Sequence, residues 1–247
     1  MNLSGLFQSV VENAVFVLEF LGIIAALFLI AVLLEKLEQK KSGTKGAIFT
    51  TRKMAMVGML SALSTALMLL EIPVFFAPFF YKLDFSELPI LIGTFAFGPA
   101  AGVMMEFIKI LLKLFIKSTS TVFVGELANF AVGCSFILPA SAIYLFKKTR
   151  KNAIFACIVG TLVMTVFGTA FNAVYLLPAF SKLFHMPLDS ILAMGGEVNP
   201  LMTEGSLVSF VAVCVGPLNL IKGAADSIVT LLIYKPLSPI LKAGRTK

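Results

Sequence analysis

Long apolar stretches follow one another along this chain, with only short polar segments between them. The first, about Val10 to Leu34, is long enough to cross a bilayer, because a helix rises about 1.5 Å per residue. Hydrophobic residues make up 59% of the 247 positions and charged residues only 13%. A soluble domain carries about 25% charged residues, so too few polar side chains remain here to cover a water-facing surface. The sequence therefore predicts an integral membrane protein.

The apolar stretches predict helices rather than a β-barrel, because they are continuous and do not alternate between apolar and polar residues. The predicted fold is an all-α membrane protein, a six-helix bundle preceded by one additional N-terminal transmembrane helix. We assign residues 1–46 to the additional helix and its linker, and residues 47–247 to the six-helix transmembrane domain. The predicted crossings are residues 10–34, 52–70, 90–97, 100–116, 122–146, 153–177 and 206–234, with loops at 73–89 and 181–205. A kink is expected at Gly216-Pro217.

Basic residues gather where the apolar stretches end. Fourteen of the 20 Lys and Arg residues lie within residues 36–53, 147–151 and 235–247. Clusters of this kind mark the cytoplasmic ends of membrane spans. They predict a multi-pass protein with its N-terminus outside and its C-terminus in the cytoplasm. The placement favours membrane anchoring over nucleic-acid binding, although the net charge is +7.

The sequence offers no metal centre and no catalytic motif. Cys134, Cys157 and Cys214 lie in apolar stretches without CxxC spacing, and His185 has no second histidine to join it. Phosphate-binding loops, nucleophile turns and zinc-protease motifs are also absent from the sequence. A membrane-embedded enzyme is therefore disfavoured. Uphill transport would have to draw on an ion gradient or on a partner ATPase.

Ionisable residues inside predicted spans cost about 2.5 to 3.5 kcal/mol each, so they need a partner or a cavity. Glu106 and Lys109 are spaced as helical neighbours, and so are Lys222 and Asp226. Each pair could be a simple internal ion pair, or Glu106 or Asp226 could be the proton-linked carboxylate of an autonomous secondary transporter. Lys222 follows the predicted kink, where an ammonium group could donate to ligand oxygens.

Two amides also lie within predicted spans. A buried amide without partners costs about 1 to 3 kcal/mol, so Asn172 must bind either a neighbouring helix or a ligand. Its donor and acceptor groups match the alternating edge of a heteroaromatic ring. Asn129, in the preceding span, has the same capacity.

Small residues recur every four positions on the span at 52–70. Gly58, Ala62 and Ala66 would form one smooth stripe along a helix, and such stripes let another helix approach closely. The stripe predicts either a contact inside the bundle or a docking face for another subunit.

Five short motifs follow one another between residues 52 and 234: KLDFSELP at 82–89, TFAFGP at 94–99, ANF at 128–130, FNAVYLLP at 171–178 and PLNLIKG at 217–223. Together they resemble the riboflavin-specific substrate-binding (S) components of energy-coupling factor (ECF) transporters. The resemblance implies a six-helix protein of the bacterial cell membrane that binds riboflavin from outside. A transmembrane coupling subunit and two cytoplasmic ATPases would complete the importer, so ATP would be used by the partners and no cofactor is expected.

The resemblance also implies roles for individual residues. Asn172 and Lys222 would hold the isoalloxazine ring, and the loop around Asp84 would close over the pocket. The stripe on the first core helix would meet the coupling subunit. The candidate substrate-binding residues are thus Asn172, Lys222, Leu83, Asp84, Phe85, Asn129 and Tyr175, and the candidate docking residues are Gly58, Ala62 and Ala66.

The sequence departs from the family pattern in two places. Residues 1–41 exceed what a six-helix component needs. The span at 100–116 carries Glu106 and Lys113, where the pattern has less charge. Because additional lysines near the outer mouth would suit a phosphorylated flavin such as FMN, both riboflavin and FMN remain candidate substrates.

Overall fold

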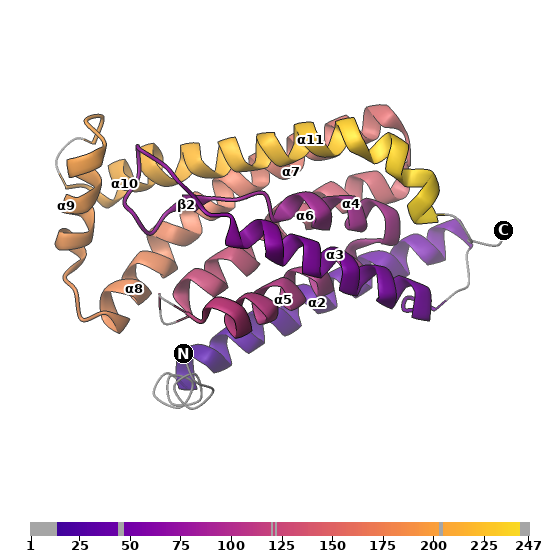
Figure 1. Ribbon diagram of the computed structural model, residues 1–247, viewed down its shortest axis with the longest axis horizontal. Helices are drawn as coiled ribbons and strands as arrows, with labels where there is room; N and C mark the ends of the chain where they lie inside the picture. Colours follow the sequence, from indigo (N-terminus) through magenta and orange to yellow (C-terminus); the bar gives the residue numbers. More distant parts are fainter. Residues whose placement is uncertain (1–13, 44–46, 120, 122, 203–204, 243–247) are drawn as a thin grey trace.

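The computed structural model describes residues 14–43, 47–119, 121, 123–202 and 205–242, which form a bundle of helices (Figure 1). Each of the seven predicted crossings corresponds to a helix over its described residues, with residues 10–13 and 122 of the predictions lying outside them, so the predicted all-α membrane fold is confirmed. In chain order the elements, with η marking a π-helix, are α2 (Ala14–Ser42), α3 (Thr51–Leu69), β1 (Ile72–Pro73), β2 (Lys82–Leu83), α4 (Glu87–Phe97), α5 (Pro99–Lys117), α6 (Val124–Phe146), α7 (Arg150–Phe171), η1 (Asn172–Leu176), α8 (Leu177–Leu183), α9 (Leu188–Val198), α10 (Leu207–Phe210), η2 (Val211–Val215) and α11 (Gly216–Lys242).

Within the described residues, four continuous helical segments are long and apolar enough to cross a membrane: Ala14–Ser42, Val124–Phe146, Arg150–Leu183 and Leu207–Leu237. Helix α4 has only 11 residues, too few to cross a hydrocarbon core of about 30 Å alone. Helix α5 is amphipathic, and the charged groups of its inner face are buried in the bundle. Burial of that face lets a helix with several charges lie among apolar ones.

The long helices run lengthwise through the molecule. Helix α7 packs along both α6 and α11, and α3 packs against α4 and α5. Figure 1 shows α9 lying across one end of the bundle, the end to which the segment between β1 and β2 also belongs, whereas α11 ends at the other end. This arrangement leaves one end of the bundle covered by short elements and irregular chain.

The sequence predicts a polar loop over residues 181–205, and for α9 that prediction is wrong. Ile191 and Leu192 of α9 are buried against Phe210 and Val211, which begin the last span. An 11-residue helix gains most of its stability from packing of one apolar face and little from its own composition. The polar composition of residues 181–205 therefore predicted a loop where tertiary packing stabilises the helix α9.

At the predicted kink, the π-helix η2 (Val211–Val215) lies directly before Gly216-Pro217. Proline has no N–H and its ring crowds the carbonyl four residues earlier, here that of Val213. The Val213 carbonyl instead accepts a hydrogen bond from Asn199 Nδ2 at 3.2 Å. A second π-helix, η1, precedes Pro178 in the same way. Such widened turns frequently occur at functional sites.

The additional helix α2 packs against α5 and α6. Near its C-terminal end the carboxylate of Glu35 is buried, accepting from Lys53 Nζ at 2.7 Å and from the Ala100 amide at 3.3 Å. Gly98 makes this approach possible, because its φ is +96° and an added Cβ would lie 2.9 Å from a Glu35 carboxylate oxygen. Helix α2 is thus held to the bundle by a buried ion pair as well as by apolar contacts.

Candidate functional site

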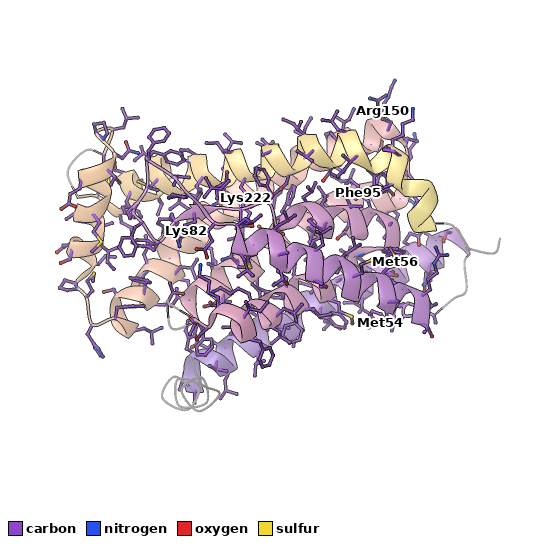
Figure 2. The ribbon with its side chains drawn as sticks, viewed as in Figure 1. Met54, Met56, Lys82, Phe95, Arg150 and Lys222 are labelled. Atoms are coloured by element: carbon purple, nitrogen blue, oxygen red, sulfur yellow. The ribbon has the colours of Figure 1, made fainter. Side chains whose placement is uncertain are left out.

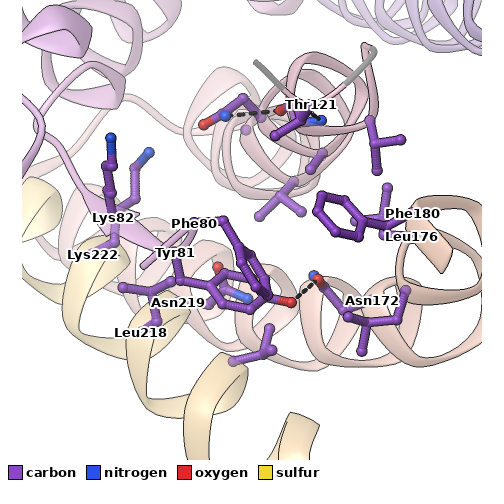
Figure 3. A pocket seen from close by; sticks show the side chains of 18 of the residues that line it. Phe80, Tyr81, Lys82, Thr121, Asn172, Leu176, Phe180, Leu218, Asn219 and Lys222 are labelled. Carbon is purple, nitrogen blue, oxygen red and sulfur yellow. Dashed lines mark hydrogen bonds between the residues drawn. The ribbon is translucent and has the colours of Figure 1, made fainter. Parts of the chain in front are cut away.

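A cavity of about 140 Å³ lies within the bundle beside the segment that links β1 and β2. Its walls come from that segment and from α4, α6, α7, η1, α8, η2 and α11. Figure 3 shows most of the lining side chains, which are Phe80, Tyr81, Lys82, Glu87, Thr121, Val124, Gly125, Ala128, Asn129, Val132, Gly133, Met164, Asn172, Leu176, Leu177, Phe180, Val215, Leu218, Asn219 and Lys222. An apolar wall with a few polar groups is the usual composition of a small-molecule site.

Three of the predicted substrate-binding residues meet in this cavity. Asn129 comes from α6, Asn172 from the first position of η1, and Lys222 from α11. Figure 2 shows Lys222 inside the bundle, whereas Arg150 lies at the end away from α9. Helices distant in sequence therefore bring together the polar side chains that the sequence singles out.

The amide of Asn172 is bound on both of its atoms. Its Nδ2 donates to the Gly168 carbonyl at 2.8 Å, and its Oδ1 accepts from the Tyr81 hydroxyl at 2.7 Å, the contact dashed in Figure 3. Burial raises the pKa of Tyr81 well above its ordinary value, so its hydroxyl stays protonated and remains a donor.

The ammonium group of Lys222 binds acids from other parts of the chain. Its Nζ lies 3.0 Å from Asp84 Oδ2 and 3.7 Å from Glu87 Oε1. The sequence suggests an ion pair between Lys222 and Asp226, one helical turn apart, and this prediction is wrong. Both carboxylate oxygens of Asp226 are buried and have no hydrogen-bond partner among the described residues.

The remaining loop candidates do not line the cavity. Leu83 lies in β2, where it pairs with Ile72 of β1, and Phe85 is half-buried. Asp84 is buried, and its Oδ2 accepts a hydrogen bond from the cavity-lining Lys222. Its Oδ1 accepts from the Ser86 amide at 2.8 Å. Within the predicted loop at 73–89, the residues that line the cavity are those just before these three candidates, Phe80 to Lys82.

Tyr175 lies in a separate hollow between η1 and α2. Its ring stacks on Phe171 and Phe16, with centroids 5.4 and 6.3 Å away, and its hydroxyl donates to Glu19 of α2. The structure therefore does not bring Tyr175 together with Asn172 and Lys222.

Two residues that border the cavity and were not among the candidates have a buried polar atom without a hydrogen-bond partner in the described part of the chain. Asn219 is buried, and its Nδ2 has no partner in the described part of the chain. Gly168 makes room for it, since an added Cβ would lie 2.5 Å from Asn219 Nδ2. Glu87 likewise has one oxygen, Oε2, without a partner among the described residues. The signal for Asn219 was present in the sequence, because it lies three residues before Lys222 and so on the same helix face.

Next to the cavity, the buried Lys109 forms ion pairs with Glu87 and Glu106. The Nζ of Lys109 lies 2.8 Å from Glu87 and 2.6 Å from Glu106, and 3.3 Å from the Ser86 hydroxyl. The pair Glu106–Lys109 that the sequence suggests is thus formed. Glu106 therefore has a charged partner in the bundle, although it shares the single positive charge of Lys109 with Glu87.

Beside the β1–β2 hairpin, Glu71 binds two lysines, Lys82 of β2 and Lys117 at the end of α5, the latter at 2.7 Å. Partial burial acts to raise the pKa of Glu71, but hydrogen bonds from Lys117 and Lys82 hold it below its usual range. The hairpin is thereby tied to α5.

The small residues of α3 lie on its outer face. Gly58, Ala62 and Ala66 are exposed, and nothing lies within 4 Å of a Cβ added at Gly58. The opposite face of α3 is buried and includes Ser64, whose hydroxyl donates to the Ser86 carbonyl. The stripe therefore forms an open surface along α3.

Comparison with known proteins places residues 52–234 in a family described as "ECF transporter, substrate-specific component". The chain is 34% identical over 198 residues to the riboflavin transporter FmnP of Bacillus subtilis (strain 168), covering 79% of this chain and 96% of that protein. It is 34% identical over 191 residues to the riboflavin transporter RibU of Staphylococcus aureus (strain TCH60), covering 77% and 93%. A solved S component of a bacterial ECF transporter matches with a TM-score of 0.61 and 35% identity, covering 77% of this chain and 97% of that chain.

Proposed function

This chain belongs to the family of ECF transporter substrate-specific components, and from that membership we propose that it captures riboflavin outside the cell for import. It is a membrane-embedded binding subunit and not an enzyme. Its two similar relatives named above are riboflavin transporters, which supports this vitamin as the substrate.

The observation that carries the proposal is the convergence of Asn172, Asn219 and Lys222 on one largely apolar cavity. The isoalloxazine ring of riboflavin has an imide edge, an N–H flanked by two carbonyls. The two amides and the ammonium group supply the complementary acceptors and donors. Phe80 and Phe180, whose ring centroids are 5.3 Å apart, provide aromatic surface for the rest of the ring.

The outer lysines favour riboflavin over FMN. Lys82 of β2 and Lys117 at the end of α5 both bind Glu71. A phosphate arriving there would have to compete with that carboxylate, whereas the neutral ribityl chain would not. We therefore propose riboflavin as the preferred form.

The proposed partners are a transmembrane coupling subunit and two cytoplasmic ATPases. The open stripe of Gly58, Ala62 and Ala66 on α3 is the proposed docking face for the coupling subunit. The basic clusters at residues 36–53 and 147–151 support a cytoplasmic location for that end of the bundle, with the N-terminus outside. The alternative of an autonomous ion-coupled transporter is not favoured, because the family works with partners and Glu106 is bound to Lys109.

The test is a titration of riboflavin fluorescence against the purified chain, without ATP or partner subunits. We expect tight, saturable quenching by the wild-type protein and binding weaker by about 1 to 3 kcal/mol in Asn172→Ala, the penalty for leaving buried groups unpaired. Absence of riboflavin binding together with tight binding of an unrelated vitamin would refute the substrate assignment.

A further inference from the structure

The segment from residue 72 to residue 86, here called the hairpin segment, contacts two of the three proposed ring-binding groups, Asn172 and Lys222. Its Tyr81 hydroxyl donates to Asn172 Oδ1 at 2.7 Å, and its Asp84 carboxylate accepts from Lys222 Nζ at 3.0 Å. A third contact fixes its tip, because Asn199 Nδ2 donates to the Phe76 carbonyl at 3.0 Å. The hairpin segment thus occupies, with its own side chains, hydrogen-bonding positions on Asn172 and Lys222 that a ligand would need.

The remaining space is too small for a flavin. Small-molecule sites usually measure about 300 to 1,000 Å³, whereas this cavity measures about 140 Å³. That volume accommodates several waters, each needing about 10 to 15 Å³ on this scale, but not three fused rings with a ribityl chain. A ligand can enter only if a lining group moves out.

Tyr81 is a lining residue that binds Asn172 inside the cavity and belongs to a segment with few backbone pairs. Its ring packs against Phe80 and Phe210, with centroids 4.7 and 6.1 Å away. The chain around it pairs through two strands of two residues each, and Phe75 and Phe79 of the same segment are exposed. Segments with so few backbone pairs open at low free-energy cost.

We propose that Tyr81 is an internal competitor of the ligand, occupying in the empty protein the hydrogen-bonding position on Asn172 that the ring edge takes in the complex. This inference rests on the proposed function for the identity of the ligand. It makes Tyr81 a specificity determinant, because displacing the phenol removes the hydrogen bond to Asn172 Oδ1.

The chemistry of the displaced contact defines the ligand class. Nδ2 of Asn172 donates to the Gly168 carbonyl, so the atom left without a hydrogen bond after Tyr81 is displaced is the acceptor Oδ1. A buried acceptor left unpaired costs about 1 to 3 kcal/mol. The entering ring must therefore bring an N–H donor on its edge, as the imide of a flavin does, and a ring with acceptors only is disfavoured.

The experiment compares the wild-type protein with Tyr81→Phe, which keeps the ring and removes the competing hydroxyl. The matched control is Tyr144→Phe, which removes a buried hydroxyl that lies 3.5 Å from the Tyr234 hydroxyl and does not line the cavity. Riboflavin affinity is measured by fluorescence titration. Amide hydrogen exchange over residues 74–86 is measured in the ligand-free protein.

We expect Tyr81→Phe to bind riboflavin about two- to tenfold more tightly than wild type, the range that corresponds to one neutral hydrogen bond, and Tyr144→Phe to match wild type. Exchange over residues 74–86 should be faster in ligand-free Tyr81→Phe and unchanged in the control. Unchanged or weaker binding in Tyr81→Phe would overturn the inference, as would unchanged exchange. If wild type fails to bind riboflavin at all, the proposed function fails, while the exchange measurement still decides whether Tyr81 holds the segment closed.

Discussion

Lys222 on α11 and Asp84 in the hairpin segment are separated by 138 positions, yet Lys222 Nζ lies 3.0 Å from Asp84 Oδ2 in the interior. Both residues are buried, so each charge depends on the other for compensation. The contact links the proposed ligand cavity to the segment that covers it. Any change at Lys222 therefore acts on the ligand and on the closure of the cavity together.

Replacing Lys222 by alanine should weaken riboflavin binding by about 1 to 3 kcal/mol, because the ligand loses a donor and Asp84 loses its cation. Fluorescence titration of the purified variant measures this, with thermal unfolding recorded alongside. Lys117→Ala is the matched control, since its side chain is 47% exposed and binds Glu71 outside the cavity. Wild-type affinity in Lys222→Ala would show that the ring binds elsewhere.

Replacing Gly168 by alanine should lower riboflavin affinity about tenfold or more, equivalent to about 1.4 kcal/mol. The added methyl group would lie 2.5 Å from Asn219 Nδ2, so that amide must rotate away from the cavity. The control is Gly22→Ala on α2, where nothing lies within 4 Å of the added Cβ. Equal affinities for the two variants would argue against Asn219 as a ligand-binding residue.

Replacing Ala62 or Ala66 by leucine should leave riboflavin binding intact and impair uptake. The leucine side chain would stand out from the open face of α3 and keep a coupling subunit at a distance. Binding is measured on the purified chain and uptake in cells or vesicles that contain the partner subunits. Ala25→Leu, on the exposed face of α2, is the control for a bulky substitution at a lipid-facing position. Normal uptake by Ala62→Leu and Ala66→Leu would exclude this docking face.

Replacing Lys53 by methionine should destabilise the protein by about 3 to 5 kcal/mol, because it leaves the buried Glu35 carboxylate without its cation. Thermal unfolding in a fixed detergent measures the change, with Lys36→Met at an exposed position of α2 as the control. The double variant Glu35→Gln/Lys53→Met should regain much of the loss, since it removes the charge and keeps an acceptor for the Ala100 amide. A single variant as stable as wild type would mean that α2 is held by apolar contacts alone.

The sequence by itself determined the membrane-embedded helical fold and singled out three polar residues of the site, Asn129, Asn172 and Lys222. Transfer from water to lipid depends on the composition of each stretch, so apolar runs located the spans from Val10 to Tyr234 without knowledge of their neighbours. A buried amide or ammonium needs a partner wherever it lies, which is why Asn172 and Lys222 could be singled out in advance.

Only the tertiary structure decided which partners these groups take. Glu106 forms an ion pair with its helical neighbour Lys109, whereas Lys222 pairs with the distant Asp84 and not with its helical neighbour Asp226. In the same way the structure turns Tyr175 toward α2 and Asn219 toward the cavity. Spacing along one helix fixes which side chains share a face, but the rotation of each helix and the approach of distant segments fix what that face meets. These are sums of many contacts between elements, and no single stretch of sequence contains them.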